Sequence, residues 1–286
     1  MKIATMINLD DLEGFDNLED LNKEFQKRVN AHNESGVDDF DGLTPMQMGA
    51  LQIFPEGAGP LNLNKLSEVE LKECPLLVKV RLLIDKMKGG KELKLTKTGA
   101  LSTKLVKEIY ALRLLKNEGI ENGITKLYKE SDAEEISITR ILLEISSLAK
   151  KRNGKLSLTK TGEKHAEDGN YILKEILSVL FYKFNWGYYD GYDSEAIGRI
   201  NPAFSLFLLK KYGSEMRSPY FYAGMYFQAF PQLMEEGDRS FRCYSLRTFQ
   251  RYFRFMGFVQ VKREDYLSPH DVKKTEFFEK LFSIDQ

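Results

Sequence analysis

The sequence repeats one short strand-like segment: LKLTKTG at 93–99 recurs as LSLTKTG at 156–162. In both copies leucines alternate with a polar residue, which is typical of a strand with one buried face. Each copy follows a segment whose apolar residues have helical spacing. These residues are Val80, Ile84 and Met87 before the first copy, and Ile141, Ile145 and Leu148 before the second. The repeat therefore predicts a helix-plus-strand unit that is used twice.

The second copy contains the signals of a complete β-hairpin. Asn153-Gly154 lies between two short strand candidates, and this dipeptide favours a type I′ turn because both of its positions take positive φ. Helix, strand, tight turn and strand follow one another as in a winged helix. The first copy has only Gly89-Gly90 between helix and strand, so its partner strand is expected downstream, at 124–128.

A third, degenerate copy is a hypothesis for the end of the chain. Leu246, Phe249, Phe253 and Met256 have the spacing of a helix face, and Gly257 is expected to end that helix. Strands are then expected at 258–262 and 272–275, followed by a helix through Phe278, Leu281 and Phe282. Here the order of elements is similar to the second copy, although the LTKTG motif is missing.

Aromatic residues divide the chain, since 28 of the 34 Phe, Tyr and Trp residues follow residue 165. We therefore predict a mainly α protein in which tandem winged-helix-like modules precede an aromatic-rich helical domain. The expected parts are an acidic N-terminal helix and linker at 1–42, the modules at 43–165, and the helical domain with its hypothetical third module at 166–286.

Charge is also unevenly distributed, although the chain has a formal net charge of zero. Residues 1–75 hold 6 Lys/Arg and 15 Asp/Glu, whereas residues 76–165 hold 20 and 11. Such asymmetry indicates a charged partner. The alternative is an acidic N-terminal part that covers a basic face of the same molecule, which requires the two regions to touch because salt screens charges over about 8 Å.

Basic residues of the repeated segment are the candidates for contacts with nucleic acid. Several surround the expected wing turn and the others lie on the preceding helices: Lys79, Arg81, Lys88, Arg140, Lys150, Lys151, Arg152 and Lys155. Lys and Arg on phosphates give affinity without sequence information. A solvated lysine-rich surface is the alternative. The helix before the second copy is expected to point Ser137, Thr139, Glu144 and Ser146 outward. These side chains provide few groups that could recognise base edges.

Signals of catalysis, metal binding and membrane insertion are weak. His32, His165 and His270 are isolated, and Cys74 and Cys243 lack metal-ligand spacing. We expect no catalytic residues, no metal and no cofactor. The chain has no apolar run of about 18 residues and a start too acidic for a signal peptide, so we expect a cytoplasmic protein without membrane contact.

Aromatic and arginine clusters near the end of the chain have two interpretations each. Trp186, Tyr188, Tyr189 and Tyr192 could line a binding surface, but packing onto the next helix is the commoner role of such residues. Arg247, Arg251 and Arg254 share the spacing of one helix face. They could contact an acidic partner or form ion pairs with carboxylates of this chain.

The segment Leu95-Thr-x-x-Gly99-x-Leu101, followed by 104–109, resembles a motif of an uncharacterised bacterial family with tandem winged-helix-like units. The stretch 42–48 is similar to the start of that family, and the resemblance covers about 42–165. Ser102 stands where proline is common in the motif. The resemblance implies tandem modules and supplies neither catalytic residues nor a substrate. Winged helices commonly bind DNA, but others serve as protein–protein modules, and the fold alone does not decide between them.

From these observations we expect a non-enzymatic protein that binds DNA or RNA through its basic segment. The alternative is a protein–protein interaction scaffold whose basic face is covered by the acidic N-terminal part. An acidic protein partner is a further expectation.

Overall fold

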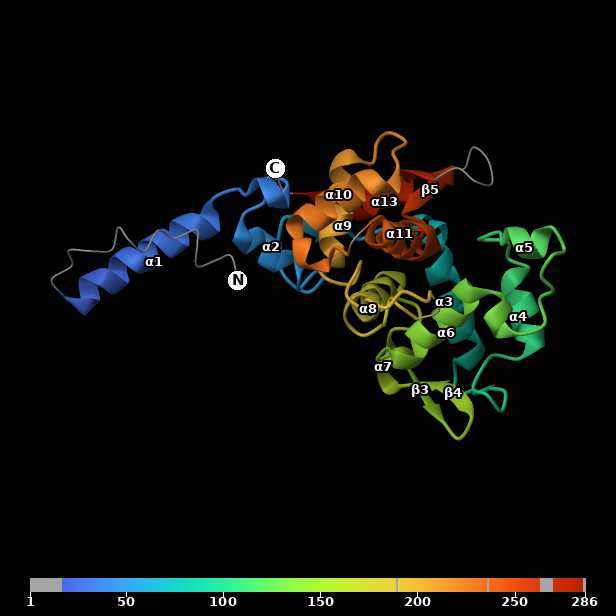
Figure 1. Cartoon of the computed structure of the whole chain (residues 1–286). Helices are drawn as coiled ribbons and strands as arrows, with labels where there is room; N and C mark the ends of the chain where they lie inside the picture. The colour runs from blue at the N-terminus through green and yellow to red at the C-terminus, as the bar shows by residue number, and fades with distance from the viewer. Residues whose placement is uncertain (1–16, 189, 236, 263–269, 285–286) are drawn as a thin grey trace.

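The computed structural model describes residues 17–188, 190–235, 237–262 and 270–284. These residues are mainly helical, with small antiparallel sheets (Figure 1). The C-terminal half is helical and rich in aromatic residues. Both features confirm the expectation of a mainly α protein with an aromatic-rich helical part toward its C-terminus.

The N-terminal part contains two α-helices, a short strand and two turns of 3₁₀-helix. The elements are α1 (Leu18–Glu34), η3 (Asp38–Phe40), α2 (Pro45–Leu51), β1 (Leu61–Leu63) and η4 (Glu70–Glu73). Helix α1 is capped by the Asn17 side chain, which accepts from the Asp20 N–H, and it contains no buried residue. Figure 1 shows α1, in blue, extending away from the rest of the molecule.

The middle of the chain alternates helices with three short strands. The elements are α3 (Pro75–Met87), β2 (Leu93–Lys94), α4 (Thr103–Tyr110), α5 (Glu118–Glu121), η5 (Glu130–Asp132), α6 (Glu134–Ile145), β3 (Ala149–Arg152), β4 (Lys155–Leu158) and α7 (Lys160–Lys164). The strands form one antiparallel sheet in the order β2–β4–β3. The turn between β3 and β4 has positive φ at Asn153 and Gly154, as expected for this dipeptide.

Both copies of the repeated heptapeptide contribute to this one sheet. Leu93 of the first copy lies directly opposite Leu156 of the second. We expected each copy to belong to a unit of its own, with 124–128 pairing with the first, but 124–128 contains no strand. The first copy pairs with β4 because its leucines then join the buried face that β4 already presents to the core.

The shared pentapeptide LTKTG takes two different conformations. In the first copy it forms a turn, with Gly99 at φ +80 and its N–H donating to the Thr96 carbonyl. In the second copy Thr159 caps α7 by accepting from the Gly162 N–H. A Cβ on Gly162 would lie 2.0 Å from the Leu148 carbonyl oxygen, so this second glycine is required by close packing, not by positive φ. The surroundings of the two copies therefore decide their local structure.

The C-terminal part consists mainly of helices, with one hairpin near its end. The elements are α8 (Gly169–Tyr182), α9 (Pro202–Tyr212), α10 (Pro219–Ala229), η6 (Pro231–Leu233), α11 (Arg239–Ser245), the π-helix η7 (Leu246–Phe253), α12 (Arg254–Met256), β5 (Val259–Lys262), β6 (Asp271–Lys274), α13 (Glu276–Leu281) and β7 (Phe282–Ile284).

The β5–β6 hairpin ends in the same capping arrangement as the β3–β4 hairpin. Thr275 donates its hydroxyl to the Gly257 carbonyl and accepts from the Phe278 N–H at the start of α13. Thr159 likewise donates to the Ser147 carbonyl and caps α7. The order helix, Gly257, strand, strand and helix is the one expected for the degenerate third copy.

Buried apolar residues from Leu43 to Phe282 form one continuous hydrophobic cluster. Helix α8 packs against both α3 and α6, and β1 pairs with β7 from the end of the chain. The core therefore continues across residue 165, where the aromatic-rich part of the sequence begins. Among the described residues, no helix has the length and apolarity needed to cross a lipid bilayer.

Candidate nucleic-acid interface

The register of the β2–β4–β3 sheet aligns basic side chains on its outer face. Lys94 lies directly opposite Lys155, and Lys155 lies directly opposite Arg152. Residues opposite one another on antiparallel strands share a face, so three cations form a row across the sheet. Lys150 lies two residues before Arg152 and shares its face, because side chains alternate along a strand. We call these four residues, Lys94, Lys150, Arg152 and Lys155, the basic face.

The other face of the sheet belongs to the core. Leu156 and Leu158 are buried there, together with Ala149. Lys151 alternates to this side, and its ammonium group lies 3.0 Å from a Glu144 carboxylate oxygen. Lys151 is nevertheless 39% exposed, so the alternation of the strands decides which basic side chains share the outer face.

Like charges that lie directly opposite one another destabilise a sheet. Glu92 reduces this repulsion at one position, since its carboxylate lies 2.5 Å from the Lys155 ammonium. Lys94, Lys150 and Arg152 are exposed and form no ion pair with any residue that the structure describes. The outer face of the sheet therefore carries a row of cations that the described carboxylates compensate only at Lys155.

Of the eight basic residues proposed from the sequence, the structure brings together Lys150, Arg152 and Lys155. Arg81 lies elsewhere and pairs with Glu68 at 2.5 Å. Lys88 contacts Asp85 and Glu167, and these hydrogen bonds raise its pKa. These two residues are therefore separate from the basic face.

Lys79 and Arg140 correct the expectation that both could reach a phosphate. Lys79 is only 3% exposed, and burial lowers the pKa of its ammonium group to about 8. The Arg140 guanidinium is enclosed by two carboxylates: its Nε donates to Glu130 at 2.9 Å and its Nη1 donates to Glu144 at 2.6 Å. Both side chains belong to the interior of the fold.

Helix α6 also differs from the expectation for a helix that reads a DNA groove. Ser137, Thr139 and Ser146, expected to point outward, are buried, whereas Ile145 is 38% exposed. The reason is that α3 and α8 both pack on α6, so it is covered on more than one side. The outer face of the sheet, not α6, is left to contact a partner.

Lys94 is a member of the basic face that the candidate set from the sequence missed. The sequence did contain a signal for Lys94, because the alternation in LKLTKTG places Lys94 on the strand face opposite to Leu93 and Leu95. The residues that lie beside Lys94 on the sheet could not be identified from the sequence, because this requires knowing that β2 pairs with β4.

Two of the three arginines expected on one helix face, Arg247 and Arg251 of η7, bind carboxylates of this chain. Arg247 and Arg251 both contact Asp190, and Arg251 also pairs with Glu134. Trp186 is fully buried and its indole N–H donates to the Leu180 carbonyl, so it has a structural role. Of the neighbouring tyrosines, Tyr189 lies outside the described residues.

The described acidic residues of the N-terminal part do not cover the basic face. Helix α1 and the β3–β4 hairpin lie far apart in Figure 1. No Asp or Glu among described residues 17–75 forms an ion pair with the four residues of the basic face. Glu68 pairs with Arg81 instead.

The segment from α3 to β4 is thus a three-stranded antiparallel sheet packed on helices, with a tight hairpin at its edge and a basic outer face. Residues 72–170, which span this segment, match the family described as the Y4jL N-terminal domain. Comparison with curated proteins and with solved structures gave no match. Within the described part of the chain, no three His, Cys, Asp or Glu residues are grouped so that they could hold a metal ion.

Proposed function

We propose that this protein binds the phosphate backbone of nucleic acid through its basic face and catalyses no reaction. The observation that carries the proposal is the row of Lys94, Lys155 and Arg152, which lie opposite one another on adjacent strands. The order α3–β2–α4–α5–α6–β3–β4, with the strand order β2–β4–β3, supports interpreting this segment as one winged-helix-like unit. In this interpretation β3 and β4 form the wing.

Binding of this kind has little sequence preference. The basic face offers ammonium and guanidinium groups suited to phosphates, whereas the polar residues of α6 that could read base edges are buried. Affinity then depends mainly on the release of counterions from the nucleic acid.

We expect the full-length protein to bind duplex DNA of unrelated sequences with similar affinity at low salt. Each phosphate contact contributes about −0.9 to the slope of log affinity against log salt, so four contacts give about −3.6. Replacing Lys150 and Arg152 with glutamine should make this slope shallower by about 2. Fluorescence anisotropy with labelled duplexes over a salt series measures both values.

The matched control is the double variant Lys23→Gln, Lys27→Gln on α1, which removes the same number of charges far from the hairpin. Its slope should equal that of the unmodified protein. Absence of binding at low salt, or equal losses in both double variants, would overturn the proposal.

A second candidate function, a protein-interaction scaffold, is favoured by α1. This helix contains no buried residue and exposes Leu18 and Phe25, so it adds nothing to the core of the fold. An apolar stripe on a projecting helix can dock into the groove of a partner. If the anisotropy experiment shows no binding of DNA, this second candidate is the one that remains.

A further inference from the structure

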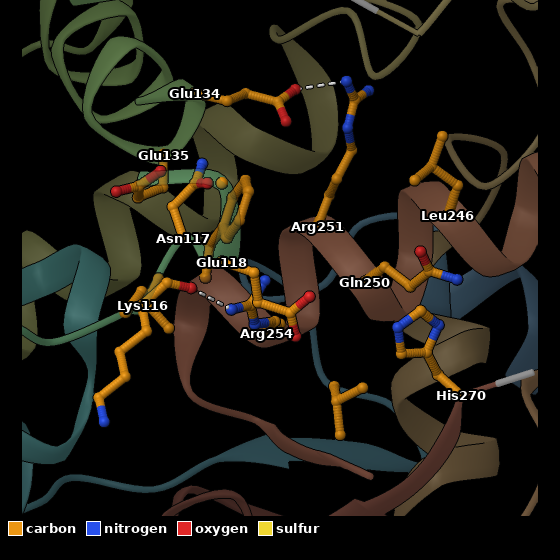
Figure 2. A pocket seen from close by; sticks show the side chains of 14 residues that line it. Lys116, Asn117, Glu118, Glu134, Glu135, Leu246, Gln250, Arg251, Arg254 and His270 are labelled. Atoms are coloured by element: carbon orange, nitrogen blue, oxygen red, sulfur yellow. Dashed lines mark hydrogen bonds and ion pairs between the residues drawn. The ribbon is translucent and has the colours of Figure 1, made fainter. Parts of the chain in front are cut away.

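A cavity of about 440 Å³ lies where the middle of the chain meets the C-terminal helices. Residues 115–119 and the start of α6 line one side, and η7 and α12 line the other (Figure 2). Its volume lies within the range of roughly 300–1,000 Å³ that is usual for small-molecule sites. We call it the junction cavity.

Two of the charged residues that line the junction cavity neutralise each other. Glu134 forms an ion pair with Arg251, which lies 3.5 Å from Asp190 as well. Figure 2 shows this Glu134–Arg251 pair at the edge of the cavity. These charges are part of the fold and leave little attraction for a ligand.

Arg254 lines the same cavity and lacks an acidic partner among the described residues. Its Nη2 donates to the Lys116 carbonyl at 2.8 Å, which uses one of the five N–H donors of a guanidinium group. The remaining donors are oriented by that bond and have the fork geometry that suits a carboxylate or a phosphate.

Lys79 adds a second, buried cation beside this wall. Its Nζ is buried and has no hydrogen-bond partner in the structure. Burial lowers its pKa, Glu135 opposes this shift and Arg254 adds to it. Helix α3, which carries Lys79, packs against α6 and α12, and both of these helices line the cavity. A buried polar group without a hydrogen-bond partner is a place to look for a missing ligand.

Part of the lining suits an organic molecule. Leu115, Leu246, Phe255 and Val261 provide apolar surface, and the Gln250 side chain provides an amide. Lys116, Asn117, Glu118 and His270 add further polar groups to the lining. The π-helix η7 contributes three of the lining residues, and π-helical turns occur frequently at functional sites.

We propose that the junction cavity binds a small organic anion, a carboxylate or a phosphate monoester with an apolar body, whose charged group is held by Arg254. The ligand would connect the segment 115–119 to the C-terminal helices. The site is separate from the basic face and does not depend on nucleic-acid binding.

Thermal unfolding of the full-length protein with three probes tests this site. Benzoate and phenyl phosphate carry an anionic group on an apolar ring, and benzyl alcohol is a neutral relative. We expect at least one of the two anions to raise the Tm with increasing concentration, and benzyl alcohol to have no comparable effect. The Tm in the presence of inorganic phosphate shows whether an anionic group without an apolar ring is sufficient for binding.

Arg254→Gln should weaken binding of the active anion by about tenfold or more, because a charge-assisted hydrogen bond is lost. The control is Arg242→Gln, which removes an arginine that pairs with Asp238 outside the cavity. This substitution should leave binding of the active anion unchanged. If Arg254→Gln does not fold, Arg254→Lys keeps the charge but loses the fork geometry of the guanidinium group, and it should also weaken binding of the active anion. No shift with either organic anion, or equal shifts in the unmodified protein and Arg254→Gln, would overturn the proposal.

Discussion

Replacing Asp190 with asparagine is expected to lower the free energy of unfolding by about 3–5 kcal/mol, because it leaves a buried cation without its partner. The side chains of Asp190 and Arg247 are both fully buried. Arg247 donates to both carboxylate oxygens, from Nε at 2.5 Å and from Nη2 at 3.1 Å. Asparagine keeps the shape of the side chain but removes the charge that compensates Arg247 and, at 3.5 Å, Arg251.

Urea unfolding of the two proteins measures this difference. The matched control is Asp238→Asn, which breaks an exposed pair with Arg242 and should change the free energy of unfolding by less than about 1 kcal/mol. Equal, small effects of both substitutions would show that the buried pair does not stabilise the fold.

Replacing Lys79 with methionine should raise the free energy of unfolding by about 3 kcal/mol at pH 7. Burial lowers the pKa of Lys79 from 10.5 to about 8, and each pKa unit corresponds to about 1.4 kcal/mol. Below pH 8 the folded protein holds a charged ammonium group in an environment that disfavours it. Methionine has a similar length and no charge, so this penalty disappears.

The advantage of the methionine variant should fall as the pH rises. Between about pH 8 and 10.5 the folded protein loses the Lys79 proton while the unfolded chain still binds it, so the unmodified protein becomes more stable with pH. The two proteins should be equally stable above pH 10.5. Denaturant unfolding across this range measures the difference, with the exposed Lys72→Met as control. A stability difference between the two proteins that does not change with pH would contradict a lowered pKa of Lys79 in the folded protein.

Local signals in the sequence predicted local structure well. The turn at Asn153-Gly154 and the helix end at Gly257 both have the positive φ that these residues favour. The pairing of β2 with β4 could not be predicted in the same way, because it joins segments 63 residues apart through tertiary contacts. The two conformations of LTKTG also depend on tertiary contacts. The pentapeptide is identical in both copies, so its sequence alone does not determine whether it forms a turn or the start of a helix.

The candidate interface was predicted only in part, because some of its features also depend on tertiary contacts. The position of Lys150, Arg152 and Lys155 beside the Asn153-Gly154 turn correctly indicated that these residues lie at the surface. Helical spacing could not show that α3 and α6 are covered on several sides, so Lys79 and Arg140 were wrongly assigned to an accessible surface. The junction cavity was not predicted, because its lining combines residues from 115 to 270 that converge only in the folded chain.

Lysine reactivity in the presence and absence of duplex DNA tests the role of the basic face most directly. Full-length protein is acetylated briefly at low salt, and the modified lysines are quantified by mass spectrometry. DNA should protect Lys94, Lys150 and Lys155, which share the outer face of the sheet, and should leave Lys23 and Lys27 of α1 reactive. Bound DNA that leaves the three sheet lysines fully reactive would contradict the proposed interface.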